Sequence, residues 1–136
     1  MRYLLDTNTV SLLVRSNAPA MTMLSRCRTG DVFVSAITEA ELRFGMAKNP
    51  SAGLRKAVEA LLSRVGVLDF TSSTAAAYGR LRAQLESSGM PMSPLDTLIA
   101  ATALEHGREP PGMVLVTNDQ AFLRVAGLTV EDWTKS

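Results

Sequence analysis

Four acidic residues stand where apolar segments end or where helices are expected to begin: Asp6, Glu41, Asp96 and Asp119. They are far apart in the sequence, but a parallel sheet would bring the carboxyl ends of its strands to one edge. Four carboxylates at one edge repel one another unless a divalent cation neutralises them. All-oxygen sites suit Mg²⁺ or Mn²⁺. Because the chain has no nucleotide-binding loop, the acids predict hydrolysis of a phosphodiester by metal-activated water.

Each acid also has a purely structural interpretation. Asp6 follows the apolar segment 3–5 and could cap the helix expected after it. Residues 38–41 read Thr-Glu-Ala-Glu, which fits a capping box, and residues 93–96 read Ser-Pro-Leu-Asp, a favourable helix start. Asp119 could cap the turn that follows it. The prediction of a site therefore depends on the joint placement of the four acids.

Helical geometry separates Glu41 from its neighbour Glu39. Glu41 shares a helix face with Ile37 and with Phe44 or Gly45, so its side chain is expected to point inward. Glu39 falls on another side of the same helix and is expected to be solvated. Glu41 is therefore the better candidate of the two.

A second helical argument concerns Asp96. The segment 95–106 is apolar nearly all round, so it is expected to be a central, buried helix. Asp96 lies on the same face of this helix as Ala100 and Ala103. An acid on a buried face needs a partner, so capping and function can both apply to Asp96.

Strands alternate with helices along the chain. Strands are expected at residues 2–5, 31–35, 67–70, 113–116 and 128–130, and helices at 9–14, 20–28, 37–47, 54–65, 71–88 and 95–106, with a helical turn at 118–125. We place a break at Asn17-Ala-Pro19. This order predicts an α/β fold in which helices flank a short, mainly parallel central sheet. The length, 136 residues, corresponds to one domain.

The composition excludes several classes of protein. With 46% hydrophobic and 20% charged residues, the chain is expected to form a packed core and not a disordered segment. A single cysteine, Cys27, and a single histidine, His106, exclude an internal disulfide and a zinc site rich in Cys or His. No apolar stretch is long enough to cross a membrane, and the first apolar run is too short for a secretory signal. We therefore expect a cytoplasmic protein without a membrane partner.

At this point the sequence resembles the PIN domains that form the toxin half of bacterial VapBC-type toxin–antitoxin pairs, the VapC family. The resemblance extends over nearly the whole chain, so residues 1–136 are expected to form one PIN domain. Five landmarks occur in the family's order and spacing: Leu-Leu-Asp-Thr-Asn at 4–8, Ser-Ala-Ile-Thr-Glu-Ala-Glu-Leu-Arg-Phe-Gly at 35–45, Pro-Leu-Asp-Thr-Leu-Ile-Ala-Ala at 94–101, Leu-Val-Thr-Asn-Asp at 115–119, and Gly-Leu-Thr-Val-Glu-Asp-Trp at 127–133.

The resemblance implies an endoribonuclease that depends on Mg²⁺ or Mn²⁺ and cuts a structured loop of tRNA or ribosomal RNA. It also implies a homodimer and a small cognate antitoxin whose tail fills the active-site groove. The family's acids fall on Asp6, Glu41, Asp96 and Asp119, and its polar helpers fall on Asn8 and Thr117. Two segments depart from the family pattern: the loop 108–112 is longer, which could shift Asp119, and the turn 91–94 lacks the usual glycine.

Two surfaces are expected to meet partners. Arg43, Arg80 and Arg82 are the candidate RNA-binding residues, with solvated helix faces as the alternative for each, and with Arg26 and Arg28 across a dimer as a second path. The net charge of +1 is too small for strong non-specific binding, so a local basic patch is needed. The helices at 54–65 and 71–88 are expected to bury apolar surface against an antitoxin or a second copy of the chain.

Two other functions use an acidic pocket on an α/β sheet. A phosphorylated receiver module would need a lysine at the end of a later strand, and Lys48, Lys56 and Lys135 all lie elsewhere. A catalytically silent PIN-like binding module would be expected to have lost an acid. None of the four is lost, so the enzyme is the favoured interpretation.

Overall fold

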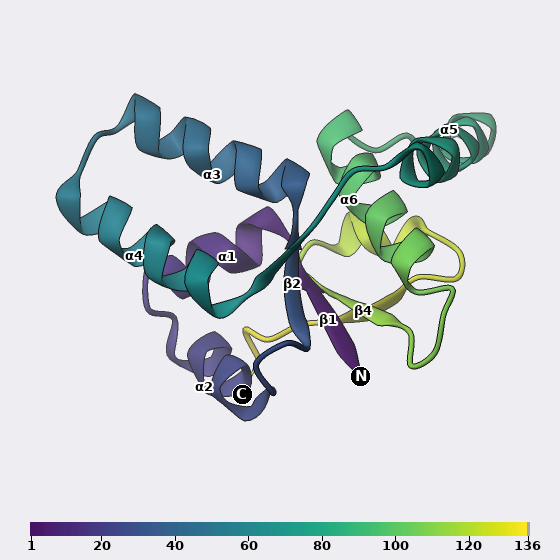
Figure 1. Ribbon diagram of the computed structural model, residues 1–136. Helices are drawn as coiled ribbons and strands as arrows, with labels where there is room; N and C mark the ends of the chain where they lie inside the picture. Colours follow the sequence, from purple (N-terminus) through teal and green to yellow (C-terminus); the bar gives the residue numbers. More distant parts are fainter. Residues whose placement is uncertain (136) are drawn as a thin grey trace.

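The computed structural model describes residues 1–135, which form a five-stranded sheet and six α-helices (Figure 1). The strands are β1 Arg2–Leu5, β2 Val32–Ser35, β3 Gly66–Leu68, β4 Met113–Val116 and β5 Thr129–Glu131. The helices are α1 Thr7–Val14, α2 Ala18–Arg26, α3 Ala36–Lys48, α4 Ala52–Arg64, α5 Ser72–Ser87 and α6 Pro94–His106, followed by the 3₁₀ helix η1 Gln120–Arg124.

All the strand pairs are parallel, in the order β3-β2-β1-β4-β5. From β1 the chain builds outward through β2 and β3, and it then returns to the other side of β1 with β4 and β5. The order therefore reverses between β1 and β4, which is the place where open α/β sheets form their binding crevice. Leu5 pairs with both Val34 and Val116, so the three central strands end level with one another.

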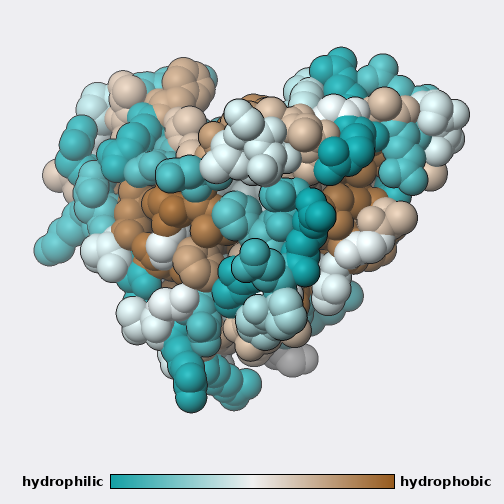
Figure 2. Space-filling model, turned by 45° about the vertical axis from the view of Figure 1, so that its right-hand side comes forward, coloured by the Kyte–Doolittle hydropathy of each residue, from teal (hydrophilic) through white to brown (hydrophobic). Residues whose placement is uncertain are grey.

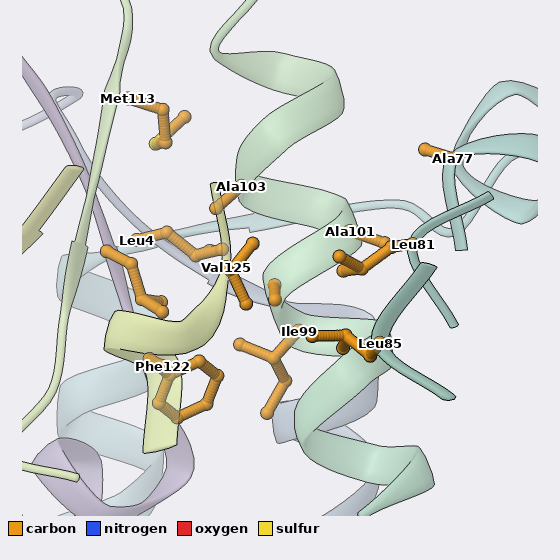
Figure 3. Packing of buried hydrophobic residues seen from close by; sticks show 12 residues of the cluster. Leu4, Ala77, Leu81, Leu85, Ile99, Ala101, Ala103, Met113, Phe122 and Val125 are labelled. Atoms are coloured by element: carbon orange, nitrogen blue, oxygen red, sulfur yellow. The ribbon is translucent and has the colours of Figure 1, made fainter. Parts of the chain in front are cut away.

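The pleat of β1 divides the core into two parts. Leu4 packs on the side of α5 and α6, whereas the next residue, Leu5, packs on the side of α1, α2 and α4. Figure 3 shows the first part, in which Leu4 lies near Phe122 and Val125 and the side chains of α6 face Leu81 and Leu85 of α5. The prediction of a central, buried helix at 95–106 is confirmed, since α6 buries residues 97 and 99–103.

Several boundaries differ from the predicted ones. The expected break at Asn17-Ala-Pro19 is present at Asn17 but does not include Ala18 and Pro19, which begin α2. Asn17 caps this helix, its side chain accepting from the Ala20 N–H at 3.1 Å, and proline fits the first turn of a helix. The helix α3 begins at Ala36, with Ser35 as its cap, so Thr38 lies inside the helix. Thr38 therefore does not cap this helix, and the capping-box interpretation of Glu41 is wrong.

The outer face of α3 was also mispredicted. Helical spacing grouped Phe44 with inward-facing residues, yet its side chain is 66% exposed, and Ala40 and Ala47 are exposed too. The reason is that α3 extends away from the carboxyl end of β2 and packs only along one side, on α1, α4 and α6 (Figure 1). Among the described residues, no helix is long and apolar enough to span a membrane.

Candidate active site

Asp6 is the buried centre of the site. It follows β1, is 3% exposed and caps α1, with the Thr9 N–H donating to its Oδ1 at 2.8 Å. The Asp6 N–H donates to the Val116 carbonyl at 3.1 Å, which continues the ladder between β1 and β4 by one bond. The predicted helix cap is therefore present. It uses only Oδ1 of Asp6, so Oδ2 does not take part in capping.

The electrostatic environment of Asp6 disfavours its charge. Burial raises the pKa of the Asp6 carboxyl, and the nearby charge of Asp96 raises it further, whereas hydrogen bonds from Thr117 and Thr9 lower it by less. Within residues 1–135, none of the four predicted acids forms a salt bridge with Lys or Arg. The carboxyl end of β1 is therefore an acidic site, in which the buried Asp6 has no salt-bridge partner among residues 1–135.

Asp96 belongs to this acidic site and lies in the first turn of α6. Ser93 caps the helix, its Oγ accepting from the Asp96 N–H at 3.2 Å, and Pro94 is the first helical residue, as predicted. Asp96 is half-buried, and Ala100 and Ala103, on its face of the helix, are 0% and 1% exposed. The predicted burial of this face is confirmed, and the nearby charge of Asp96 contributes to the raised pKa of Asp6.

Glu41 occupies the second turn of α3. Its Oε1 accepts a hydrogen bond from the Thr7 hydroxyl at 2.7 Å, next to Asp6 in the sequence. Glu39 instead binds Arg43 at 3.0 Å on the outer side of the helix. The predicted inward direction of Glu41 is confirmed, and Glu39 is paired with Arg43 where solvation alone was expected.

Asp119 lies at the carboxyl edge of the sheet, three residues after the end of β4, and is exposed. Its Oδ1 accepts from the Ala121 N–H at 2.9 Å, so it caps η1, and its own N–H donates to the Thr117 hydroxyl oxygen at 3.0 Å. Thr117 is 2% exposed and is the residue that links Asp119 to Asp6. The longer loop at 108–112 leaves β4 in register with β1.

Asn8 makes a second connection between the start of α1 and the segment that follows β4. Its Nδ2 donates to Oδ1 of Asn118 at 2.7 Å, which ties the first turn of α1 to the segment after β4. Both side chains are exposed. The two predicted polar helpers, Asn8 and Thr117, thus both bridge the ends of β1 and β4.

The donor set fits a hard divalent cation. Within the described residues, no three His, Cys, Asp or Glu side chains form a group arranged to hold a metal ion. Mg²⁺, however, is usually bound through one or two carboxylates, and water and substrate phosphate complete its shell. Asp6 and Asp96 would fit such a pair, because both are carboxylates, the charge of Asp96 raises the pKa of Asp6, and neither forms a salt bridge among residues 1–135. Glu41 and Asp119 border this pair and do not join it in one cluster.

Sequence reasoning missed a set of hydroxyl groups beside Glu41. Thr7 contacts Thr38 as well as Glu41, and Thr38 contacts Ser35. A signal was present in the sequence, because Thr38 stands three residues from both Ser35 and Glu41 and so shares their side of the helix. The position of Thr7 opposite them is visible only in the structure.

A cleft of about 400 Å³ opens beside Glu41, between α1, α3 and α4. Its residues are mainly apolar: besides Thr7, Asn8 and Glu41 at the acidic end, it is lined by Ser11, Val14, Arg15, Leu42, Gly45, Met46, Leu54 and Val58. In Figure 2 a hydrophilic central band separates two exposed hydrophobic areas, and a notch divides the upper part of the molecule into two lobes.

The expected excess of apolar surface on α4 and α5 is not found. Neither helix carries a strongly exposed large apolar side chain among the described residues, because both turn these side chains into the core. The strongly exposed ones are Met1, Met21, Phe44, Val67, Phe70, Met90, Leu95 and Leu123. The apolar surface that α4 offers to a partner is therefore the part that lines the cleft, at Leu54 and Val58.

The three candidate arginines have different surroundings. Arg43 is paired with Glu39 and, at 3.8 Å, with Glu59, whereas Arg82 binds Glu86 at 2.8 Å. Arg82 lines a cavity with Pro94 and Thr97, at the same end of α6 as Asp96. Arg80 lies beside Leu104 and Glu105, about 13 Å along α6 from Asp96. Of the two arginines on α5, Arg82 is therefore closer along α6 to Asp96 than Arg80 is.

Comparison with known proteins agrees with this geometry. A sequence model of the PIN domain family matches residues 3–128. The chain is 32% identical over 136 residues to the tRNA(fMet)-specific endonuclease VapC of Shigella flexneri, with 98% of this chain and 99% of that protein covered. It is 34% identical over 135 residues to Ribonuclease VapC2 of Haemophilus influenzae, with 98% of each covered.

Solved structures give the same result. VapBC2 from Rickettsia felis, bound to a DNA fragment from its promoter, contains a chain that superposes with a TM-score of 0.85 at 29% identity, covering 98% of this chain and 99% of that one. DNA-bound VapBC from Salmonella typhimurium gives 0.84 at 32% identity, covering 98% of both chains. With the acids on the switch point of a parallel sheet, these matches show that the chain belongs to the PIN domain family, in the group that includes the VapC ribonucleases.

Proposed function

We propose that the protein is the toxin of a toxin–antitoxin pair and a Mg²⁺- or Mn²⁺-dependent endoribonuclease. The observation that carries the proposal is the pair Asp6 and Asp96 at the carboxyl end of the sheet, where the charge of Asp96 raises the pKa of Asp6 and neither acid forms a salt bridge among residues 1–135. Such a pair would lower stability if it had no cation to hold. The printed names of the relatives, a tRNA(fMet)-specific endonuclease and ribonucleases, support hydrolysis of RNA.

In the proposed mechanism Asp6 and Asp96 would hold the cation, and Glu41 and Asp119 would add acidic side chains near it. The bound ion would supply Lewis acidity to the scissile phosphate and a water of lowered pKa. A hydrogen bond from Thr117 lowers the pKa of Asp6, against the larger effect of burial, and the Thr117 hydroxyl oxygen accepts from the Asp119 N–H. Asn8, tied to Asn118, holds the first turn of α1 against the end of β4.

The proposed substrate is a folded RNA loop, in tRNA or ribosomal RNA. The acidic site repels phosphate until a cation is bound, so productive binding needs both the metal and nearby basic groups. Arg82 is the best placed of the three predicted arginines. Its pair with Glu86 is exposed on both sides, and such surface pairs are weak enough to exchange for a phosphate.

The proposed partners are a cognate antitoxin and a second copy of the chain. The similar solved structures from Rickettsia felis, Salmonella typhimurium and Haemophilus influenzae are of VapBC, the pair that the resemblance identifies as toxin and antitoxin. The cleft between α1, α3 and α4 offers an antitoxin an apolar surface that ends at Glu41. A peptide lying in it would cover the acidic end and so block access of RNA to Asp6.

Mapping the 5′ ends of RNA after brief expression tests the proposed activity. We expect new ends at one or a few sites in wild-type cells and none with Asp6→Asn. Asp69→Asn, which changes an exposed acid after β3, is the matched control and should cleave like the wild type. If neither brief expression nor purified protein with Mn²⁺ produces ends that depend on Asp6, the domain is a silent binding module and the proposal is wrong.

A further inference from the structure

A line of hydroxyl groups crosses from the end of β2 to the start of α1. The Ser35 hydroxyl donates to Thr38 Oγ1 at 3.3 Å, Thr38 Oγ1 lies 3.1 Å from Thr7 Oγ1, and the Thr7 hydroxyl donates to Glu41 Oε1 at 2.7 Å. Three elements, β2, α3 and α1, each contribute a member. The line ends on one of the predicted acids.

The order of donors in this line is determined by its last member. An ionised carboxylate only accepts hydrogen bonds, and each hydroxyl has a single proton. Since Thr7 donates its proton to Glu41, Thr38 must donate to Thr7. The Ser35 oxygen accepts from the Thr38 N–H at 3.0 Å, so the Ser35 proton is available to Thr38. Donation therefore runs in one direction, from Ser35 through Thr38 and Thr7 to Glu41.

Burial makes this order stable. Ser35 is 1% exposed and Thr38 is 0% exposed, so water does not compete for their hydroxyl groups. Hydrogen bonds in series strengthen one another in such surroundings. A charged acceptor at the end strengthens the last bond further, in keeping with its length of 2.7 Å.

Thr7 is not needed for the local structure of α1. Asp6 already caps this helix through the Thr9 N–H. The hydroxyl of Thr7 makes both of its hydrogen bonds to α3 and none within its own helix. The Thr7 hydroxyl therefore bonds only to Glu41 and to Thr38, the residue that orients it.

We propose that Thr7 is a positioning residue, which holds the Glu41 carboxylate at the first turn of α1, one residue from Asp6 in the chain, through a hydroxyl oriented by Thr38 and Ser35. Without it, Glu41 would be free to rotate on a half-exposed helix turn. The catalytic part of this inference rests on the proposed ribonuclease function, whereas the contact between Thr7 and Glu41 can be measured without any activity.

The experiment compares Thr7→Val, which keeps the shape and removes the hydroxyl, with Thr7→Ser, which keeps the hydroxyl. Thr22→Val, an exposed change in α2, controls for the loss of a hydroxyl from a helix. The steady-state kcat and KM for a cleaved RNA are measured at saturating Mn²⁺ for folded protein. We expect Thr7→Val to lower kcat by about 10–100-fold, the range typical of groups that support a metal-site residue, with KM little changed. Thr7→Ser and Thr22→Val should keep the wild-type kcat.

A double-mutant cycle in urea tests the contact independently. Thr7→Val and Glu41→Ala are combined, and the free energy of unfolding of the four proteins is compared. Non-additive changes support the contact, and this result stands even if wild-type protein cleaves no RNA, which would refute only the proposed function. Additive changes overturn the inference, as does a wild-type kcat in Thr7→Val. Thr7→Ala serves in both measurements if Thr7→Val does not fold.

Discussion

Asp6 and Thr117 leave the sheet side by side. Leu5 pairs with Val116, and the Asp6 N–H donates to the Val116 carbonyl at 3.1 Å, so the residues after these partners lie at the same level. The hydrogen bond from Thr117 lowers the pKa of Asp6, which burial and Asp96 raise. Thr117 therefore opposes the protonation that would disable Asp6 as a metal ligand.

The first prediction concerns stability without metal. Because burial raises the pKa of Asp6, the folded protein retains the Asp6 proton to higher pH than the unfolded chain. The contribution of Asp6 to stability is therefore full below the unfolded pKa and is lost as the pH rises through the folded pKa. Asp6→Asn cannot ionise and remains a good helix cap. In EDTA at pH 7 it should unfold at higher urea than the wild type, and the difference should vanish near pH 3.5.

The control for this measurement is Asp69→Asn, whose position is exposed. It should unfold like the wild type at both pH values. A wild type that is more stable than Asp6→Asn at pH 7 in EDTA would mean that Asp6 is stabilised in its ionised form, against the direction argued here.

The second prediction concerns the metal. Mg²⁺ or Mn²⁺ at about 100 times its Kd should stabilise the wild type by about 2.7 kcal/mol, since it binds only the folded state. Thermal unfolding with and without the ion measures this effect. The stabilisation should disappear in Asp96→Asn, together with RNA cleavage, because one of the two interacting carboxylates is lost. An equal metal effect in both proteins would place the ion elsewhere.

The third prediction distinguishes the two glutamates of α3. Glu41→Gln should lower cleavage by at least about 10-fold, because a neutral amide supports a cation poorly. Glu39→Gln only weakens an exposed pair with Arg43. It should change the rate by less than about 2-fold and the stability by less than about 1 kcal/mol. Similar losses in both variants would contradict the separation of the two residues by helix face.

The fourth prediction concerns RNA binding. Arg82→Glu should weaken RNA binding and flatten its dependence on salt by about one unit of slope, as expected when one phosphate contact is lost. Filter binding at several salt concentrations, with the inactive Asp6→Asn protein as the background, measures both quantities. Arg80→Glu and Arg43→Glu are the comparisons, since Arg80 lies farther along α6 and Arg43 already has two acidic partners. If the salt dependence of RNA binding is unchanged in all three variants, the RNA does not contact these arginines, and Arg26 and Arg28 are the next candidates.

The fifth prediction concerns the antitoxin. Leu54 is half-buried in the wall of the cleft, so Leu54→Asp should weaken the complex with the product of the neighbouring gene by at least about 10-fold, or about 1.4 kcal/mol. Met21→Asp, an exposed apolar position on α2, is the matched control. Titration calorimetry measures both. Equal affinity in the two variants would exclude this cleft as the binding surface.

The sequence alone determined the acids, the alternation of strands and helices, and the inward direction of Glu41. These features are local, because they depend on hydrophobic period, helix starts and the spacing of residues within one element. The burial of the helix face that carries Asp96, Ala100 and Ala103 followed from the same reasoning, since a helix apolar all round packs on most of its sides.

The tertiary structure decided which of these features meet. Only the strand order β3-β2-β1-β4-β5 puts the end of β1 beside the end of β4, and no local pattern encodes that order. The exposure of Phe44 depends on how far α3 extends beyond its neighbours. The contact between Thr7 and Glu41 joins residues 34 positions apart, and it forms because β1 and β2 end at the same level and deliver α1 and α3 to the same edge.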